Sequence, residues 1–276
     1  MRRLKGVPLY LVLGLVSAPF LVMYLAFFLQ AFSEEISLGV IPRGIGISKN
    51  FGFLWKPIPW GLERTTIWEV LLNTLLFAGA SGGTVTIICL LAGYALSRID
   101  FRGKGFMLSL QLLLHAFPGH ILLIAIFFLL FYLRLLYTIP GVAIARASIE
   151  IPLGIWMVKG FFDAVPSDVE RSAMVDGCNR FQVWQKIFLP LLKPGMAAVF
   201  IWGFLFAWHE FIFVYTLLPG TVRLMSTLIE ALVATEVMPP GLLAAVSLFY
   251  MLPPLTLFVF LQKALLKVPI LGGKGM

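Results

Sequence analysis

The chain has 276 residues, of which 60% are hydrophobic and only 12% are charged. With a mean hydropathy of +0.98, this composition lies far outside the range of soluble domains and predicts an integral membrane protein. The net charge of +8 is explained by basic residues that flank apolar segments, so we expect no nucleic-acid partner.

Six apolar stretches predict an all-α protein whose six transmembrane helices form a single domain over residues 1–276. The predicted spans cover residues 7–32, 68–96, 106–133, 141–161, 195–218 and 241–262. Each is long enough to cross the hydrocarbon core of a bilayer as a helix. The first is too long for a signal-peptide core and lacks a small-residue cleavage site, so we retain it as a span.

The segments between the spans differ in composition. Residues 33–66, rich in Gly, Pro and Trp, are expected to form a partly structured external loop, and a second external loop ends near Pro240. Pro118-Gly119 should break the third span, Pro152 lies inside the fourth, and Pro253-Pro254 should kink the sixth.

The distribution of basic residues predicts that both chain ends are cytoplasmic. The basic residues assigned to the cytoplasmic side are Arg2, Arg3, Lys5, Arg98, Arg102, Lys104, Lys159, Arg171, Arg180, Lys186, Lys193, Lys263, Lys267 and Lys274. A smaller group falls on the outer side: Arg43, Lys49, Lys56, Arg64, Arg134 and Arg223. Cys89 lies in a span and Cys178 in a polar segment, so we expect no disulfide between them.

Residues 163–194 form a polar segment between the fourth and fifth spans. Ser167 with Glu170 is a capping-box pattern, which predicts a helix that ends near Val175, before Asp176-Gly177. Asn179 can cap a second helix. That helix carries a broad apolar face, made of Phe181, Val183, Trp184, Ile187 and Phe188, and Pro190 and Pro194 should close it. The pattern indicates a water-exposed helical hairpin with a face that can dock on a partner.

This hairpin resembles the cytoplasmic loop of ABC-type import permeases. Their consensus reads E-A-A, three residues, G, nine residues, I, one residue, L-P. The chain has Arg171-Ser172-Ala173, then Gly177, Ile187 and Leu189-Pro190 in the same register. Arg171 replaces the consensus glutamate, which leaves that glutamate's role open; Glu170 stands one position earlier. Asn73 and the run GYALSRIDFRGK also resemble the second span and basic turn of this family. The alternative is a polar loop whose helix signals are accidental.

The resemblance implies a type I importer of the carbohydrate-uptake group, similar to the maltose permease subunit, in the cell membrane of a prokaryote. Its implied partners are a second permease subunit, two copies of an ATPase subunit and an extracytoplasmic solute-binding protein. ATP and Mg would bind to the ATPase, so this chain would hold no cofactor and be no enzyme; it has no Gly-rich phosphate loop. The residues implied in ATPase coupling are Glu170, Arg171, Ala173, Asp176, Gly177, Arg180, Phe181, Trp184, Ile187, Leu189 and Pro190.

Ionisable and aromatic residues within the spans indicate a translocation path. Its candidate residues are Arg146, Glu150, Trp202, Phe206, His209, Glu210 and Phe213. Arg146 and Glu150 stand at i, i+4, where they can neutralise each other. Trp202, Phe206, His209 and Phe213 follow one helical stripe, with an aromatic surface that suits sugar rings.

Alternatives remain for these residues. The charges of Arg146, Glu150 and Glu210 could form a relay in a stand-alone secondary transporter or channel, and a membrane enzyme is a third reading. The aromatic stripe could simply pack against neighbouring spans. The run FIWGFLFAWHEF and the ending LGGKGM resemble the carbohydrate branch of the family, although His209 replaces its usual asparagine. His115 and His120 point to different helix faces, so we expect no metal site.

Overall fold

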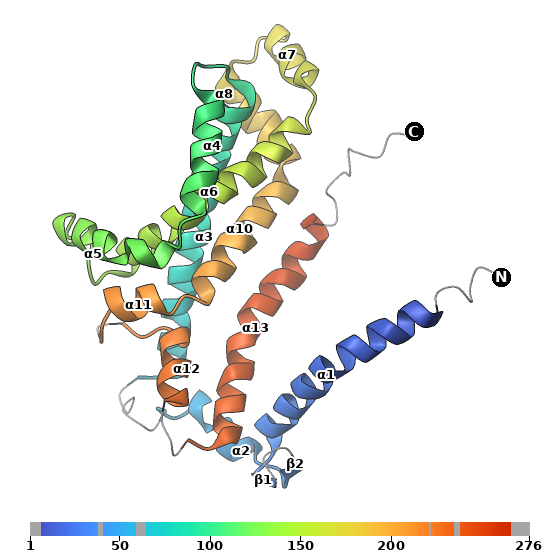
Figure 1. Cartoon of the computed structure of the whole chain (residues 1–276), viewed down its shortest axis with the longest axis vertical. Coiled ribbons are helices and arrows are strands. Elements are labelled where there is room, and N and C mark those ends of the chain that lie inside the picture. Colours follow the sequence, from blue (N-terminus) through green and yellow to red (C-terminus); the bar gives the residue numbers. More distant parts are fainter. Residues whose placement is uncertain (1–6, 38–40, 59–64, 221, 235–237, 266–276) are drawn as a thin grey trace. The chain divides into compact units, whose positions relative to one another are not determined.

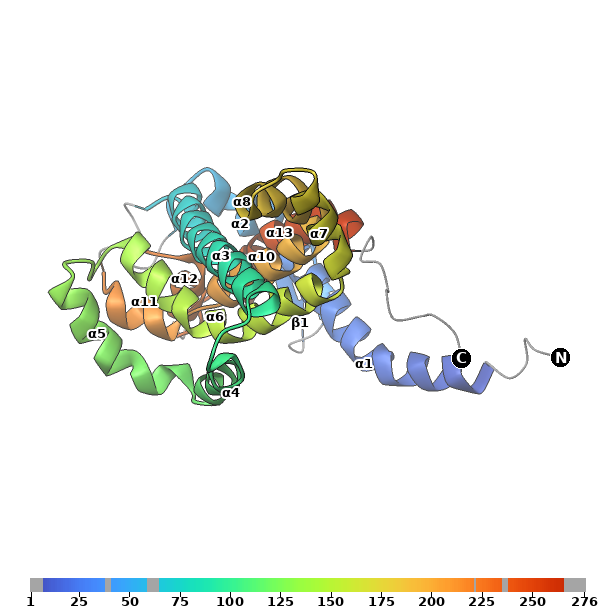
Figure 2. The same ribbon diagram turned by 90° about the horizontal axis from the view of Figure 1, so that it is seen from above.

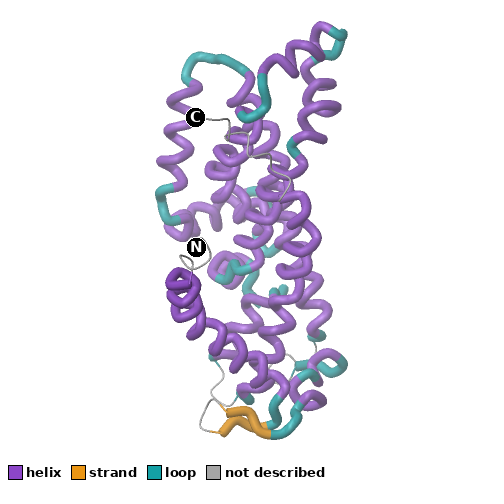
Figure 3. Tube along the Cα trace, turned by 90° about the vertical axis from the view of Figure 1, so that its right-hand side faces the viewer, coloured by secondary structure: helices purple, strands orange, loops and turns teal. Residues whose placement is uncertain are grey.

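The computed structural model describes residues 7–37, 41–58, 65–220, 222–234 and 238–265. Nearly all of this part is helical, with one short two-stranded ribbon (Figure 3). Within it, four helices are long and apolar enough to cross a membrane, or up to six spans if each of two bent helix pairs counts as one. The predicted all-α membrane fold is confirmed. Arg2, Arg3, Lys5, Arg64, Lys267, Lys274 and the LGGKGM ending lie outside the described residues.

The long helices coincide with predicted spans. They are α1 (Val7–Phe32), α3 (Ile67–Arg98), α6 (Ile139–Asp163) and α13 (Pro240–Leu265) (Figure 1). Contacts divide the chain into two compact units, one of residues 1–70 with 228–253 and the other of residues 71–227 with 254–276.

The first unit is organised around the end of α1. The ribbon pairs β1 (Glu35–Ser37) with β2 (Ile41–Arg43) in antiparallel register, and α2 (Ile47–Asn50) and η2 (Gly52–Leu54) follow. The buried Asn50 amide donates to the carbonyls of Ala31 and Ser33, at 3.0 and 2.7 Å, and so satisfies groups that the helix end leaves open. A Cβ on Gly241 would lie 2.5 Å from that amide, so α13 begins directly against Asn50.

The second unit packs α3 against α6 and α10 (Lys193–Trp208) through small residues. A Cβ on Gly93 would lie 2.8 Å from Val158, and one on Gly154 would lie 2.6 Å from Cys89 Sγ. Gly82 approaches the Phe200 carbonyl of α10 in the same way. The glycines allow the backbones to approach closely at these crossings. A larger side chain would not fit between them.

Two spans of this unit are interrupted. The first pair is α4 (Lys104–His115) and α5 (Leu123–Tyr132), joined by η3 (Gly119–Leu122) with a bend of 90°. Pro118-Gly119 lies at this bend, as the sequence predicts. The other bent pair joins Arg180–Leu191 to α10 with a bend of 76°. The fifth predicted span, 195–218, is also not one helix, because α10 ends at Trp208 and α11 (Ile212–Leu217) begins after a break.

Side-chain hydrogen bonds explain the second break. The Glu210 carboxylate accepts the Phe213 amide hydrogen at 3.1 Å, and Ser226 Oγ donates to the Glu210 carbonyl at 2.8 Å. Such bonds offer the backbone an alternative to the helical ladder. Ser226 belongs to α12 (Met225–Val233), a helix within the stretch predicted to be the second external loop.

Candidate functional site

Residues 163–194 form the predicted helical hairpin. Its first arm is α7 (Ser167–Val175), and its second is α8 (Arg180–Val183), followed by a π-helical turn, η4 (Trp184–Phe188), and α9 (Leu189–Leu191). Gly177 has φ +91°, the left-handed conformation that glycine adopts without steric cost. The predicted helix end and turn are therefore confirmed, and Figure 2 shows α7 and α8 next to each other.

The caps of the two arms differ from expectation. The capping box predicted at Ser167 and Glu170 is wrong, because Pro166 is the N-cap and no side chain caps α7. The capping box instead joins Asn179 and Gln182. The Asn179 side chain accepts the backbone amide hydrogen of Gln182 at 2.8 Å, and the Gln182 side chain accepts that of Asn179 at 2.9 Å.

Pro190 and Pro194 were expected to close the second arm, and only the second closure is confirmed. The arm continues through Pro190 in α9, ends at Leu191 and bends by 76° before α10, whose first turn contains Pro194. A missing amide hydrogen costs little at that position.

The inner side of the hairpin is anchored in the second unit. Ala173, Val183 and Phe188 are buried there. The Phe188 ring contacts Tyr94 and Phe162, with centroids 5.6 and 5.3 Å away. Ile187, Leu189 and Trp184 pack against the same core. Trp184 is thus only half-exposed, which corrects the expectation that it stands on the outer face.

The outer side presents apolar groups to solvent. Phe181 is 66% exposed, Val175 is 86% exposed and Met174 is 42% exposed. The same two arms carry exposed charged side chains: Asp168, Arg171, Asp176, Arg180 and Lys186. Exposed apolar patches with a polar rim are typical of protein–protein contact sites. We refer to Met174, Val175 and Phe181 as the docking patch.

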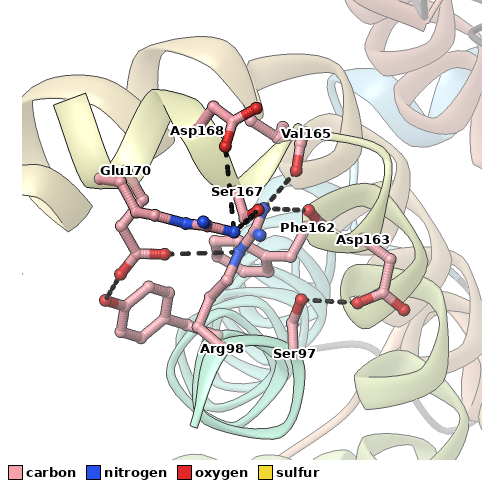
Figure 4. Close-up of polar contacts among 10 residues, drawn as sticks. Ser97, Arg98, Phe162, Asp163, Val165, Ser167, Asp168 and Glu170 are labelled. Atoms are coloured by element: carbon pink, nitrogen blue, oxygen red, sulfur yellow. Dashed lines mark hydrogen bonds and ion pairs between the residues drawn. The ribbon is translucent and has the colours of Figure 1, made fainter. Parts of the chain in front are cut away.

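Glu170 faces inward rather than toward the docking patch. Its carboxylate accepts the Tyr94 hydroxyl hydrogen at 3.0 Å and lies 3.7 Å from Arg98 Nε (Figure 4). Arg171 occupies the position of the consensus glutamate. Its described contacts are both within its own helix, to Ser167 Oγ at 2.8 Å and to Asp168 at 3.9 Å. Tyr94 and Arg98 were not predicted to contact the hairpin, although both lie in the GYALSR run.

A second candidate site contains three buried charges. Arg146 Nη1 lies 2.8 Å from Glu150, and Arg146 Nε lies 2.6 Å from Glu210. The guanidinium also lies over the Phe206 ring, 5.6 Å from its centroid. A cavity of about 550 Å³ adjoins this cluster, and Arg146, Phe206, His209, Glu210 and His120 line it together with Leu205, Phe211 and Ile212.

The structure brings together only some of the predicted path residues. Because the helix ends at Trp208, the stripe expected from Trp202 to Phe213 is interrupted. Phe213 is buried against the His120 ring, and Trp202 packs on Phe206 with centroids 4.3 Å apart. His120 enters the cavity because Pro118-Gly119 turns the chain there. Within the described ranges, no three His, Cys, Asp or Glu side chains group closely enough to hold a metal ion.

Comparison with known proteins identifies the class to which this geometry belongs. The family model for the binding-protein-dependent transport system inner membrane component matches residues 85–267. The chain belongs to this family of ABC importer permeases. Family membership decides against the stand-alone secondary transporter, channel or membrane enzyme that the sequence left open.

Individual relatives agree with this assignment. The chain is 31% identical to a probable ABC transporter permease of Pyrococcus horikoshii (71% of this chain, 72% of that protein). It is 30% identical to the diacetylchitobiose uptake system permease protein DasC of Streptomyces coelicolor (73% of each chain). The inner membrane ABC transporter permease protein YcjP of Escherichia coli is 26% identical over 97% of this chain and 94% of its own.

Solved structures share the fold. The crystal structure of a bacterial ABC transporter involved in alginate import matches with a TM-score of 0.75 at 20% identity, over 95% of this chain and 96% of that one. A structure of a bacterial alginate ABC transporter in complex with an alginate pentasaccharide-bound periplasmic protein matches with a TM-score of 0.65 at 17% identity.

Proposed function

We propose that this permease subunit imports a sugar or related polar solute and that its hairpin docks on a cytoplasmic ATPase subunit. The observation that carries the proposal is the docking patch, where Met174, Val175 and Phe181 stand exposed on a hairpin that also carries many exposed charged side chains. A free cytoplasmic loop gains nothing by exposing such groups, whereas a cleft in a partner would bury them. The turn at Gly177 aims the patch.

The proposed assembly contains this chain, a second permease subunit, two ATPase subunits that bind ATP and Mg, and an extracytoplasmic solute-binding protein. The family description, which names binding-protein-dependent transport, supports the last partner. The protein lies in the cell membrane, and in our proposal both chain ends are cytoplasmic. The excess of basic residues around the hairpin and at the two ends supports that orientation.

A sugar is the proposed solute because the chain resembles a diacetylchitobiose permease and because its buried polar site suits hydroxyl groups. The cavity beside Arg146 combines an aromatic ring, Phe206, with carboxylate and imidazole groups that can bond hydroxyls. We assign the solute path to this site, with Arg146, Glu150, Phe206, His209 and Glu210 around it and Trp202 and Phe213 supporting the rings.

The test is retention of the ATPase on purification. The chain, produced with its partner subunits, should co-purify with an ATPase, and Phe181→Ala should weaken this association by about 2 kcal/mol, or roughly 30-fold. Phe131→Ala is the matched control, because Phe131 is similarly exposed (59%) but lies in α5. A wild-type transporter that imports solute with no ATPase attached would contradict the proposal.

A further inference from the structure

The junction between α6 and α7 is held by side chains from a different helix. α6 ends at Asp163, and Pro166 precedes the first residue of α7. Pro166 has no amide hydrogen and disfavours a helical conformation at Val165, so the chain must turn here. Within the turn the Val165 amide donates to the Phe162 carbonyl at 3.1 Å, and any further donors to these carbonyls come from elsewhere.

Arg98, the last residue of α3, supplies those donors. Its Nη2 donates to the carbonyl oxygens of Phe162 and Val165, both at 2.6 Å (Figure 4). Its guanidinium lies over the Phe188 ring, 5.1 Å from the centroid, and its Nε lies 3.7 Å from Glu170. One side chain, only 10% exposed, therefore contacts the end of α6, the first turns of α7 and the second arm of the hairpin.

Two neighbours on α3 reinforce this contact. Tyr94, Ser97 and Arg98 share one face of the helix, because they are spaced i, i+3 and i+4. Ser97 Oγ donates to Asp163 at 2.6 Å, and the Tyr94 hydroxyl donates to Glu170 at 3.0 Å. A cation is also favourable beside the carbonyl end of α6.

We propose that Arg98 is a positioning residue that makes α3 and the hairpin move as one body during transport. If the hairpin docks on the ATPase, a displacement there passes to α6 through the chain itself. At this end α3 is not covalently joined to the hairpin. The displacement therefore reaches α3 only through the contacts of Arg98, Tyr94 and Ser97. The inference rests on the proposed docking function of the hairpin.

The experiment compares Arg98→Met with Arg102→Met in the complete reconstituted transporter. Methionine keeps an unbranched apolar stem and removes the guanidinium with its donors. Arg102 is the matched control, because it lies in the same basic turn but is exposed. We expect Arg98→Met to keep membrane insertion and ATPase retention, since the docking patch is untouched, and to lose at least about tenfold in uptake per ATP hydrolysed. Arg102→Met should transport like the wild type.

A distance measurement separates positioning from general stability. Spin labels at Leu91 in α3 and Ser172 in α7, both exposed, report their separation after Cys89→Ala and Cys178→Ser remove the native thiols. In the wild type the distance should not change between the nucleotide-free and ATP-bound transporter. In Arg98→Met the distribution of distances between the two labels should broaden, and its mean should change when nucleotide binds. Arg98→Lys, which can keep one carbonyl bond, should fall between the two and decides the matter if Arg98→Met fails to insert.

The outcomes are distinct from those that test docking itself. A wild-type complex without ATPase would refute the docking function. Retained ATPase together with normal coupling in Arg98→Met, or an equal nucleotide-dependent change in the wild type, would overturn the role of Arg98 alone.

Discussion

Arg146 Nε lies 2.6 Å from a carboxylate oxygen of Glu210, although Arg146 belongs to α6 and Glu210 follows the end of α10. The same guanidinium bonds Glu150 at 2.8 Å, so one buried cation is shared between two carboxylates. Removing the cation leaves both carboxylates buried without their partner. This is far more costly than removing the whole cluster.

We therefore expect Arg146→Met to destabilise the folded protein by about 3–5 kcal/mol. Adding Glu150→Gln and Glu210→Gln to that variant should restore most of the loss. The measurement is the thermal unfolding midpoint and the yield of the detergent-purified protein. If the triple variant is as unstable as the single one, charge pairing is not the role of Arg146. Normal folding with transport that no longer depends on pH would instead indicate proton relay.

The turn at Gly177 gives a second prediction. A Cβ at Gly177 would meet no atom within 4 Å, so the resistance to substitution comes mainly from its φ of +91°. Gly177→Val should cost about 1–2 kcal/mol locally and redirect α8, because β-branched residues tolerate left-handed φ poorly. We expect loss of solute-stimulated ATP hydrolysis with normal membrane insertion.

Gly220 supplies the control for this change. It also has a left-handed φ, +69°, with open space around it, but lies outside the hairpin. Gly220→Val should cost a similar amount of stability and leave stimulated hydrolysis intact. Equal loss of hydrolysis in both variants would show that the effect comes from general destabilisation.

A third prediction concerns the crossing of α3 and α6. A Cβ on Gly93 would meet Val158 at 2.8 Å and the Lys159 amide nitrogen at 3.2 Å, so Gly93→Ala should push the helices apart and cost about 1–3 kcal/mol. Gly83 lies in the same helix with nothing within 4 Å. Gly83→Ala should be neutral or stabilising by up to about 1 kcal/mol, since alanine is the better helix former. Unfolding midpoints of the two variants in detergent decide between these outcomes.

A fourth prediction concerns orientation. Single cysteines at Lys104 and Arg180, introduced after Cys89→Ala and Cys178→Ser, should react with an impermeant thiol reagent only in permeabilised cells. A cysteine at Lys49 should react in intact cells, because it stands in the loop assigned to the outer side. Labelling of position 180 from outside would reverse the topology and remove the hairpin from the cytoplasm.

Structural features that depend on neighbouring residues could be predicted from the sequence, whereas features that depend on residues far apart in the chain could not. The hairpin turn and its second cap depend on Gly177 and Asn179, which act within a few residues, so local patterns indicate both. The long helices follow from apolar length alone. The break after Trp208 depends on Ser226, and the inward orientation of Glu170 depends on Tyr94 and Arg98. Such distant partners leave no local pattern, so the sequence predicted a continuous helix and a capping glutamate instead.

The break in the helix at 209–211 also limits what can surround the protein next to the cavity. Backbone groups outside regular helices cannot lie against acyl chains, because lipid offers no hydrogen bonds to them. Ser226 satisfies the Glu210 carbonyl, but the adjoining cavity is open beside Arg146 and His209. The annulus of lipid must therefore stop short of this face, which water, solute or another protein chain has to cover.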